Sequence, residues 1–199
     1  TTSILITTTS STSTSILVYE PMILITSAID LYTMGDETYG CKCNQSLTYD
    51  FKIGKYEITN KWYWTAMEDG LYSNSNFWTT SGWNWKEGCN GETNSPCYYL
   101  DKNNPIPRYY NDINLNSENQ PILGISWYES VAFCEWLNHK SGKSKAYLNT
   151  GAIISLTSDS YRLPTEVEWE YVASKGSYTE IERKYAFGNV WDCTKAVCK

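Results

Sequence analysis

The sequence has little positive charge to offer a polyanion. Its 199 residues hold 16 Lys and Arg against 22 Asp and Glu, which gives a formal net charge of −6. No cluster of basic residues occurs along the chain, and nucleic-acid binding needs such a patch to contact phosphates. The charge pattern therefore excludes a nucleic-acid-binding protein.

Long apolar runs are also missing. The apolar stretches at residues 16–18 and 22–25 are short and flanked by polar residues, whereas a membrane-spanning helix needs about 20 apolar residues in a row. We expect no membrane span. The chain starts at Thr1 without a basic, apolar leader, as a mature protein does after loss of a signal peptide, although a shortened chain would look the same.

Histidine is nearly absent, which limits metal binding and catalysis. His139 is the only one, and the Cys-x2-Cys pairs typical of zinc sites do not occur, so we predict no metal site and no cofactor. His139 stands at the polar end of a predicted helix, where Ser/His/Asp catalysis is not expected. Glu166, Glu168 and Glu170 begin another helix, and the helix dipole alone explains them.

Cysteine, by contrast, is plentiful. Cys134 falls in the apolar pattern of a predicted helix, and we expect it to be buried and reduced. The other six are disulfide candidates in loop-like surroundings: Cys41, Cys43, Cys89, Cys97, Cys193 and Cys198. Spacing favours the local pairs Cys89–Cys97 and Cys193–Cys198. Because disulfides form in oxidising compartments, the chain is predicted to be extracellular or at the cell surface.

Aromatic residues are abundant, with nine Trp and seventeen Tyr. Many lie within residues 71–120, which we expect to form an ordered, Asn- and Ser-rich insertion. Their side chains suit stacking on a glycan, binding a protein, or internal packing, and composition does not choose among these. The candidates for a ligand surface are Trp78, Trp83, Trp85, Tyr109 and Tyr110.

The N-terminal region, residues 1–19, is rich in Ser and Thr. Because β-branched residues favour extended chain, we predict an extended arm that is either a strand or a flexible, glycosylated stalk. As a strand, the arm would pair with the sheet of another copy through Ile4, Ile6 and Ile16. Residues 20–199 would form the folded domain.

Helix signals are clear in three places within that domain. Thr59 is a predicted N-cap for residues 60–69. Ser126 with Glu129 is a capping box for residues 127–140, and Thr165 repeats the device for residues 166–175. Short strands are predicted at residues 22–27 and 49–53, with the glycosylation sequon Asn44-Gln45-Ser46 in the turn-rich stretch between them. Without regular strand-helix alternation, the fold class is α+β.

Several segments together resemble the formylglycine-generating-enzyme, or sulfatase-modifying-factor, family. The segments are Tyr32-Thr-Met-Gly35, Phe51-Lys-Ile-Gly-Lys-Tyr-Glu-Ile-Thr-Asn60, Gly124-Ile-Ser-Trp-Tyr128, Ala132-Phe-Cys-Glu-Trp-Leu137, Tyr161-Arg-Leu-Pro-Thr-Glu-Val-Glu-Trp-Glu-Tyr171 and Tyr185-Ala-Phe-Gly-Asn189. Their order and spacing also agree with the family. The resemblance implies a C-type-lectin-like fold over residues 20–199.

The resemblance also implies where the family's chemistry would lie. Its calcium ligands and the redox cysteine pair that binds copper belong to a second half of the domain, which we expect beyond Lys199. The matching segments in this sequence are structural, because Thr165 caps a helix while Val167, Trp169 and Tyr171 are expected to supply apolar contacts. No catalytic residue is carried over.

Three functions follow as hypotheses. The first is a non-catalytic extracellular structural protein that joins other copies of itself in a surface filament or layer through the arm. The second is a lectin-like module that binds a glycan or a protein through residues 71–120. The third is a fragment of a formylglycine-generating-type enzyme. The main prediction is the first, and hence that the chain is not an enzyme.

Overall fold

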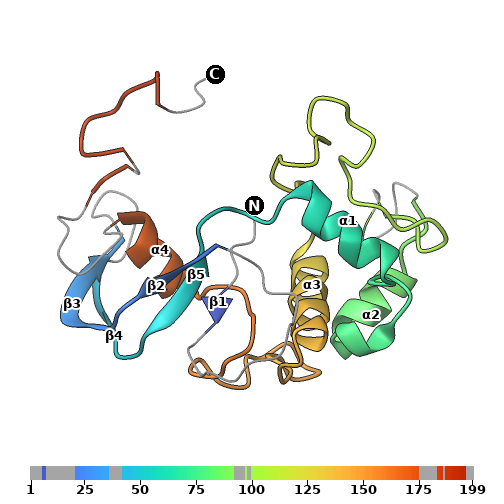
Figure 1. The fold of residues 1–199 in the computed structure, drawn as a ribbon, viewed down its shortest axis with the longest axis horizontal. Helices are drawn as coiled ribbons and strands as arrows, with labels where there is room; N and C mark the ends of the chain where they lie inside the picture. Colours follow the sequence, from blue (N-terminus) through green and yellow to red (C-terminus); the bar gives the residue numbers. More distant parts are fainter. Residues whose placement is uncertain are drawn as a thin grey trace. The chain divides into compact units, whose positions relative to one another are not determined.

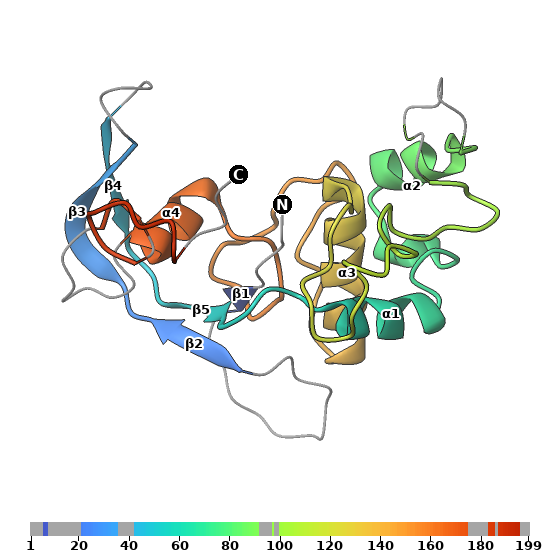
Figure 2. The same ribbon diagram turned by 90° about the horizontal axis from the view of Figure 1, so that it is seen from above.

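A computed structural model describes residues 6–7, 21–35, 42–91, 97, 100–174, 183–185 and 187–195 (Figures 1 and 2). Its compact units are residues 1–23 with 52–163, and residues 24–51 with 164–199. In chain order the elements are β1 (Ile6–Thr7), β2 (Met22–Ile25), β3 (Ala28–Met34), β4 (Cys43–Leu47), β5 (Phe51–Gly54), α1 (Asn60–Glu68), the short 3-10 helix η1 (Ser75–Phe77), α2 (Thr80–Glu87), α3 (Trp127–Lys140) and α4 (Glu166–Ser174). Helices with small antiparallel sheets confirm the α+β class.

Helix α3 is the centre of the first unit. The predicted capping box is present, because the Ser126 hydroxyl accepts from the Glu129 amide and the Glu129 carboxylate accepts from the Ser126 amide. All ten residues from Glu129 to Asn138 are buried, as expected for a helix surrounded by protein. Helix α1 lies beside α3 in both views, and its Tyr63 ring stacks on Phe133 with centroids 5.5 Å apart (Figures 1 and 2).

Helix α1 also holds the end of the aromatic insertion. Thr59 accepts from the Trp62 amide as the predicted N-cap. The Asn60 side chain donates to the carbonyls of Leu115 and Ser117 at 2.9 and 2.8 Å. Because Asn60 is 3% exposed, these bonds satisfy a buried amide and fix the loop against the helix.

Two elements of the insertion were not predicted from the sequence. Asn74 and Thr79 are the N-caps of η1 and α2, each accepting a backbone amide two or three residues on. Helix α2 contains Gly82, which weakens helix propensity. A Cβ atom there would meet the Tyr128 ring at 3.1 Å, so glycine permits the close approach of α2 to α3. The insertion is ordered where the structure describes it.

The N-terminal arm pairs within its own chain. Strand β1 runs antiparallel to β5, with Ile6 opposite Ile53 and Thr7 opposite Lys52, in a three-stranded sheet of order β1-β5-β2. The partner of this segment in the structure is therefore β5 of its own chain, whereas a strand of another copy was predicted. Ile4 and Ile16 lie outside the described residues.

The second unit is built on a β3–β4 pair covered by α4 (Figures 1 and 2). Thr165 and Glu168 form the predicted capping box, and Glu168 also accepts from the Tyr49 hydroxyl at 2.9 Å. Trp169, expected to supply an apolar contact, is 51% exposed instead, whereas Glu168 and Tyr171 are buried. The helix turns its charged capping residue inward because that carboxylate has two donors there.

Candidate functional site

A pocket of about 540 Å³ lies beside α1 and α2 in the first unit. This size is typical of small-molecule sites. Both helices contribute to it: Met67 comes from α1, and Trp83, Lys86 and Glu87 come from α2. Lys102 from the following loop completes the charged lining.

Lys86 is the most unusual residue of the pocket, because a lysine rarely becomes this buried. It is 4% exposed. Its ammonium donates to the Tyr72 carbonyl at 3.0 Å, pairs with a Glu87 carboxylate oxygen at 2.7 Å and lies 3.9 Å from the centre of the Trp83 ring. The ammonium of Lys86 thus has three favourable contacts. Lys86 also lies in the last turn of α2, where the negative end of the helix dipole stabilises a positive charge.

The partner carboxylate stays ionised. The hydrogen bond from Lys86 lowers the pKa of Glu87, and the charges of Lys86 and Lys102 add to this effect. Its side chain is 44% exposed, so solvent weakens the attraction. The charged residues of the pocket lining are thus two lysines and one glutamate.

A buried chain of hydrogen bonds begins at Tyr72, which lines the pocket. The Tyr72 hydroxyl donates to Glu129 at 2.5 Å and lies 3.1 Å from the Tyr63 hydroxyl. Burial, more than the neighbouring groups, raises the pKa of Tyr72 well above its usual value, so it remains a neutral donor. The other Glu129 oxygen accepts from the Ser126 amide at 2.7 Å. The chain links the pocket to the start of α3.

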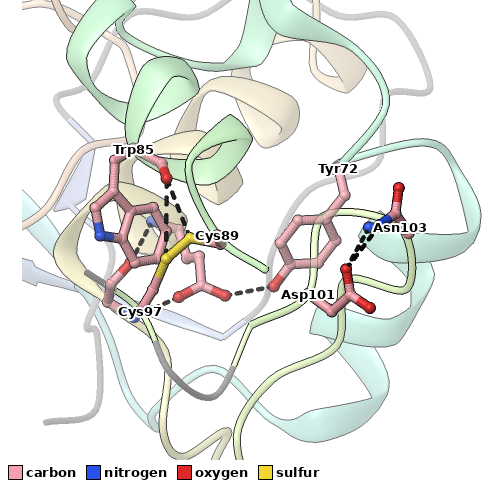
Figure 3. Close-up of a disulfide and its surroundings, with 8 residues drawn as sticks. Tyr72, Trp85, Cys89, Cys97, Asp101 and Asn103 are labelled. Atoms are coloured by element: carbon pink, nitrogen blue, oxygen red, sulfur yellow. Dashed lines mark hydrogen bonds between the residues drawn. A yellow bond between two sulfur atoms is a disulfide. The ribbon is translucent and has the colours of Figure 1, made fainter. Parts of the chain in front are cut away.

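The predicted Cys89–Cys97 disulfide is present and sets the position of Lys102. The two Cα atoms are 5.4 Å apart, and the Lys102 amide donates to the Cys89 carbonyl at 3.2 Å. Figure 3 shows the bridge beside Trp85, and it shows the Asp101 carboxylate accepting a hydrogen bond from the Asn103 amide. Bridge and turn together hold the backbone on both sides of Lys102.

A second polar cluster joins α3 to the Arg-Leu-Pro segment. The Asn138 side chain donates to the Tyr161 carbonyl at 2.9 Å and accepts from its amide at 2.6 Å. The guanidinium of Arg162, which is 1% exposed, donates to the carbonyls of Leu156 and Leu163. These hydrogen bonds go to backbone groups, and the Asn138 pair fixes the segment to α3.

Glu135 belongs to the same cluster and has one carboxylate oxygen without a partner. Oε1 accepts from the amides of Ala146 and Tyr147, both at 2.9 Å, while Oε2 is buried and makes no hydrogen bond. Burial raises the pKa of Glu135, and the two amides and the Lys145 charge partly offset the rise. Glu135 is not among the residues that line the pocket beside α1 and α2.

Of the five predicted ligand-surface aromatics, one is buried and the other four are half-buried against neighbouring side chains. Trp78 is 4% exposed and its indole donates to the Leu71 carbonyl at 2.8 Å. The remaining rings lie against neighbours: Trp85 against Tyr128, Tyr110 against Trp64, and Tyr109 beneath Arg108. Trp83 alone among the five candidates lines the pocket.

None of the predicted site residues is Lys86, Glu87 or Lys102. A usable signal was present, because Thr79 is a helix N-cap and places Trp83 and Lys86 on one face at a spacing of three residues. The neighbouring glycines at 82 and 88 obscured the helix.

The other cysteine and glycosylation candidates have separate outcomes. Cys43 has a free thiol, and its cross-strand neighbour on β3 is Met34. Cys134 is buried as predicted, and burial raises the pKa of its thiol. Cys41 and Cys198 lie outside the described residues, so the Cys193–Cys198 bridge stays a prediction. Asn44 is exposed on β4.

Copper and calcium, which the family resemblance implies, do not fit the part of the chain that is described. Its cysteines are either bridged to each other or apart, and no group of three His, Cys, Asp or Glu side chains gathers in the described segments. Likewise, none of the described helices is long and apolar enough to cross a membrane.

Two curated proteins are similar to this chain. Hercynine oxygenase of Mycobacterium tuberculosis is 26% identical over 138 residues, which is 69% of this chain and 27% of that protein. Hercynine oxygenase of Mycolicibacterium thermoresistibile is 23% identical over 141 residues, or 70% and 25%. The chain thus spans about a quarter of the length of these relatives.

These relatives correct the main functional prediction. Both are named as enzymes, so the expectation of a non-catalytic filament or layer subunit, and with it the statement that the chain is no enzyme, is wrong. The inference failed because it equated missing family motifs with missing activity. The enzyme-fragment alternative agrees better with the relatives.

The resemblance on which that alternative depends is confirmed over nearly the whole chain. Residues 18–197 match the sulfatase-modifying factor enzyme 1-like domain. The matched range contains both capping boxes, the Arg-Leu-Pro segment and the pocket. The chain belongs to the sulfatase-modifying factor enzyme 1-like family.

Proposed function

We propose that the chain is part of an oxygenase of this family and that it acts on hercynine or a related small molecule. The similarity to two hercynine oxygenases is the observation that supports this proposal. Because the chain covers about a quarter of those proteins, the activity belongs to the proposal and to the whole gene product.

In this proposal the described residues provide a rigid framework. Helix α3 is buried along ten residues and begins at a capping box, and the Asn138–Tyr161 clamp fixes the next segment to it. Rigid, well-packed elements hold reacting groups in place more accurately than loops do. We assign no proton transfer and no redox step to the described residues.

Oxygen uptake by the complete gene product tests the proposal. We expect dissolved oxygen to fall when hercynine is added, and mass spectrometry to find an oxidised hercynine product. A cysteine-containing sulfatase peptide serves as the second substrate, because the family resemblance also implies formylglycine formation. Uptake with the peptide alone would replace hercynine as the substrate, and no uptake with either would refute the oxygenase assignment.

We further propose that the chain is exported. The Cys89–Cys97 disulfide supports this proposal, because such bridges persist in oxidising compartments, and the exposed Asn44 sequon is compatible with it. Blocking thiols with an alkylating reagent before cell lysis, followed by mass mapping, tests it. Recovery of Cys89 and Cys97 as alkylated thiols would contradict export.

A further inference from the structure

The pocket beside α1 and α2 has one unmatched positive charge. Lys86 and Glu87 neutralise each other at 2.7 Å. The ammonium of Lys102, also in the lining, makes no hydrogen bond or ion pair with any described residue. One excess positive charge thus faces the pocket, although the chain as a whole has a net charge of −6. An anion is the ligand that this local charge favours.

The rest of the lining favours an apolar body on that anion. Met67, Trp83 and Pro105 line the same pocket, and a tryptophan ring offers a flat apolar surface for stacking. Asp69, which follows α1, is paired with Lys140 at 2.9 Å. A dianion such as phosphate would leave one of its two charges without a partner, which is costly where water is partly excluded.

We propose that this pocket binds a small monocarboxylate with a flat apolar body, its carboxylate on Lys102 and its body against Trp83. The buried Lys86 holds the Trp83 ring and the Tyr72 backbone in place, and the Cys89–Cys97 bridge holds the backbone of Lys102. The site is thus largely formed before the ligand arrives, which lowers the cost of binding. This inference does not depend on the oxygenase proposal.

Nuclear magnetic resonance with two matched probes tests the site on the full chain. Phenylacetate carries the charge and the ring, and phenylacetamide keeps the ring without the charge. At constant ionic strength we expect saturable shifts at the Trp83 indole N–H and at the amides of Gly70 and Ser73, and about fivefold tighter binding of phenylacetate. Equal affinity for the two probes, or shifts that do not saturate, would overturn the proposal.

A pair of lysine variants separates this site from general charge effects. Lys102→Gln is expected to weaken phenylacetate binding about fivefold and to leave phenylacetamide binding unchanged. Lys61→Gln removes an exposed lysine that pairs with Glu118 away from the pocket, and it should leave both affinities unchanged. If Lys102→Gln has no effect, or if Lys61→Gln weakens phenylacetate equally, the carboxylate does not bind at Lys102.

Discussion

At the scale of single residues, burial is decided by whether polar atoms find partners. Trp136 is fully buried, and its indole N–H donates to Asp69 at 2.7 Å. Asp69 is also bound by Lys140 at 2.9 Å, and these bonds lower its pKa, the one from Lys140 most. Trp169 has the same side chain on the other capped helix but is 51% exposed. Residue type alone could not distinguish the two.

The two tryptophans give a matched pair of stability predictions. Trp136→Ala should lower the free energy of unfolding by about 3–5 kcal/mol, because it opens a cavity and removes the indole N–H that donates to Asp69. Trp169→Ala should change it by less than about 1 kcal/mol, because the side chain is half exposed. Urea unfolding followed by circular dichroism measures both. Equal losses in the two variants would contradict these different environments.

Glu135 makes the stability depend on pH. Burial raises its folded pKa above the ordinary value of 4.5, so the native state holds the proton more tightly than the unfolded chain does. This contribution stabilises the protein below the unfolded pKa and is lost as pH rises through the folded pKa. Asp69 acts in the opposite direction, because its lowered pKa removes stability only below about pH 4.

We therefore predict that Glu135→Gln flattens the pH dependence of stability in the range above pH 4.5. In the unmodified protein the contribution of Glu135 should grow as pH falls across this range. The measurement is the free energy of unfolding in urea at several pH values. Glu166→Gln, which changes an exposed carboxylate at the start of α4, should keep the original slope. An unchanged slope in Glu135→Gln would show that its carboxyl titrates normally.

At the scale of elements, capping signals predicted well and sheet pairing did not. Helix α3 has the predicted bounds, and α1 ends one residue before its predicted end. Helix α4 begins at the predicted residue, Glu166, and its predicted end at Lys175 lies outside the described residues. Caps are local, so sequence alone can identify them. Strand β4 was expected to be a turn region, because its residues Cys-Asn-Gln-Ser-Leu have low β-propensity. Its pairing with β3 is a tertiary effect.

The disulfide is the element-level feature whose removal we can quantify. The bridge closes a short loop between positions eight apart in sequence, so reducing it should lower the free energy of unfolding by roughly 2–3 kcal/mol. Thermal unfolding with and without a phosphine reductant measures this loss. A Cys89→Ala/Cys97→Ala double variant should resemble the reduced protein and ignore the reductant. Equal stability with and without reductant in the unmodified chain would contradict the prediction.

At the scale of the whole molecule, the motifs identified the family but not the pocket. The capped helices and the Arg-Leu-Pro segment follow one another within the range that matches the family. The order of these motifs in the sequence is enough to recognise them. The pocket instead brings Met67, Lys86 and Lys102 together, and their proximity depends on how α1, α2 and the bridged loop pack. Of the predicted ligand aromatics, only Trp83 reaches it.

The assembly state of the whole molecule should not depend on the N-terminal arm. Strand β1 already pairs with β5 of the same chain, so deleting residues 1–7 removes this internal two-residue ladder. We expect a loss of about 1–2 kcal/mol in unfolding free energy and an unchanged number of chains per particle. Light scattering of the intact and shortened proteins, with circular dichroism to show that both are folded, measures this. A folded, shortened protein with fewer chains per particle would contradict the internal pairing.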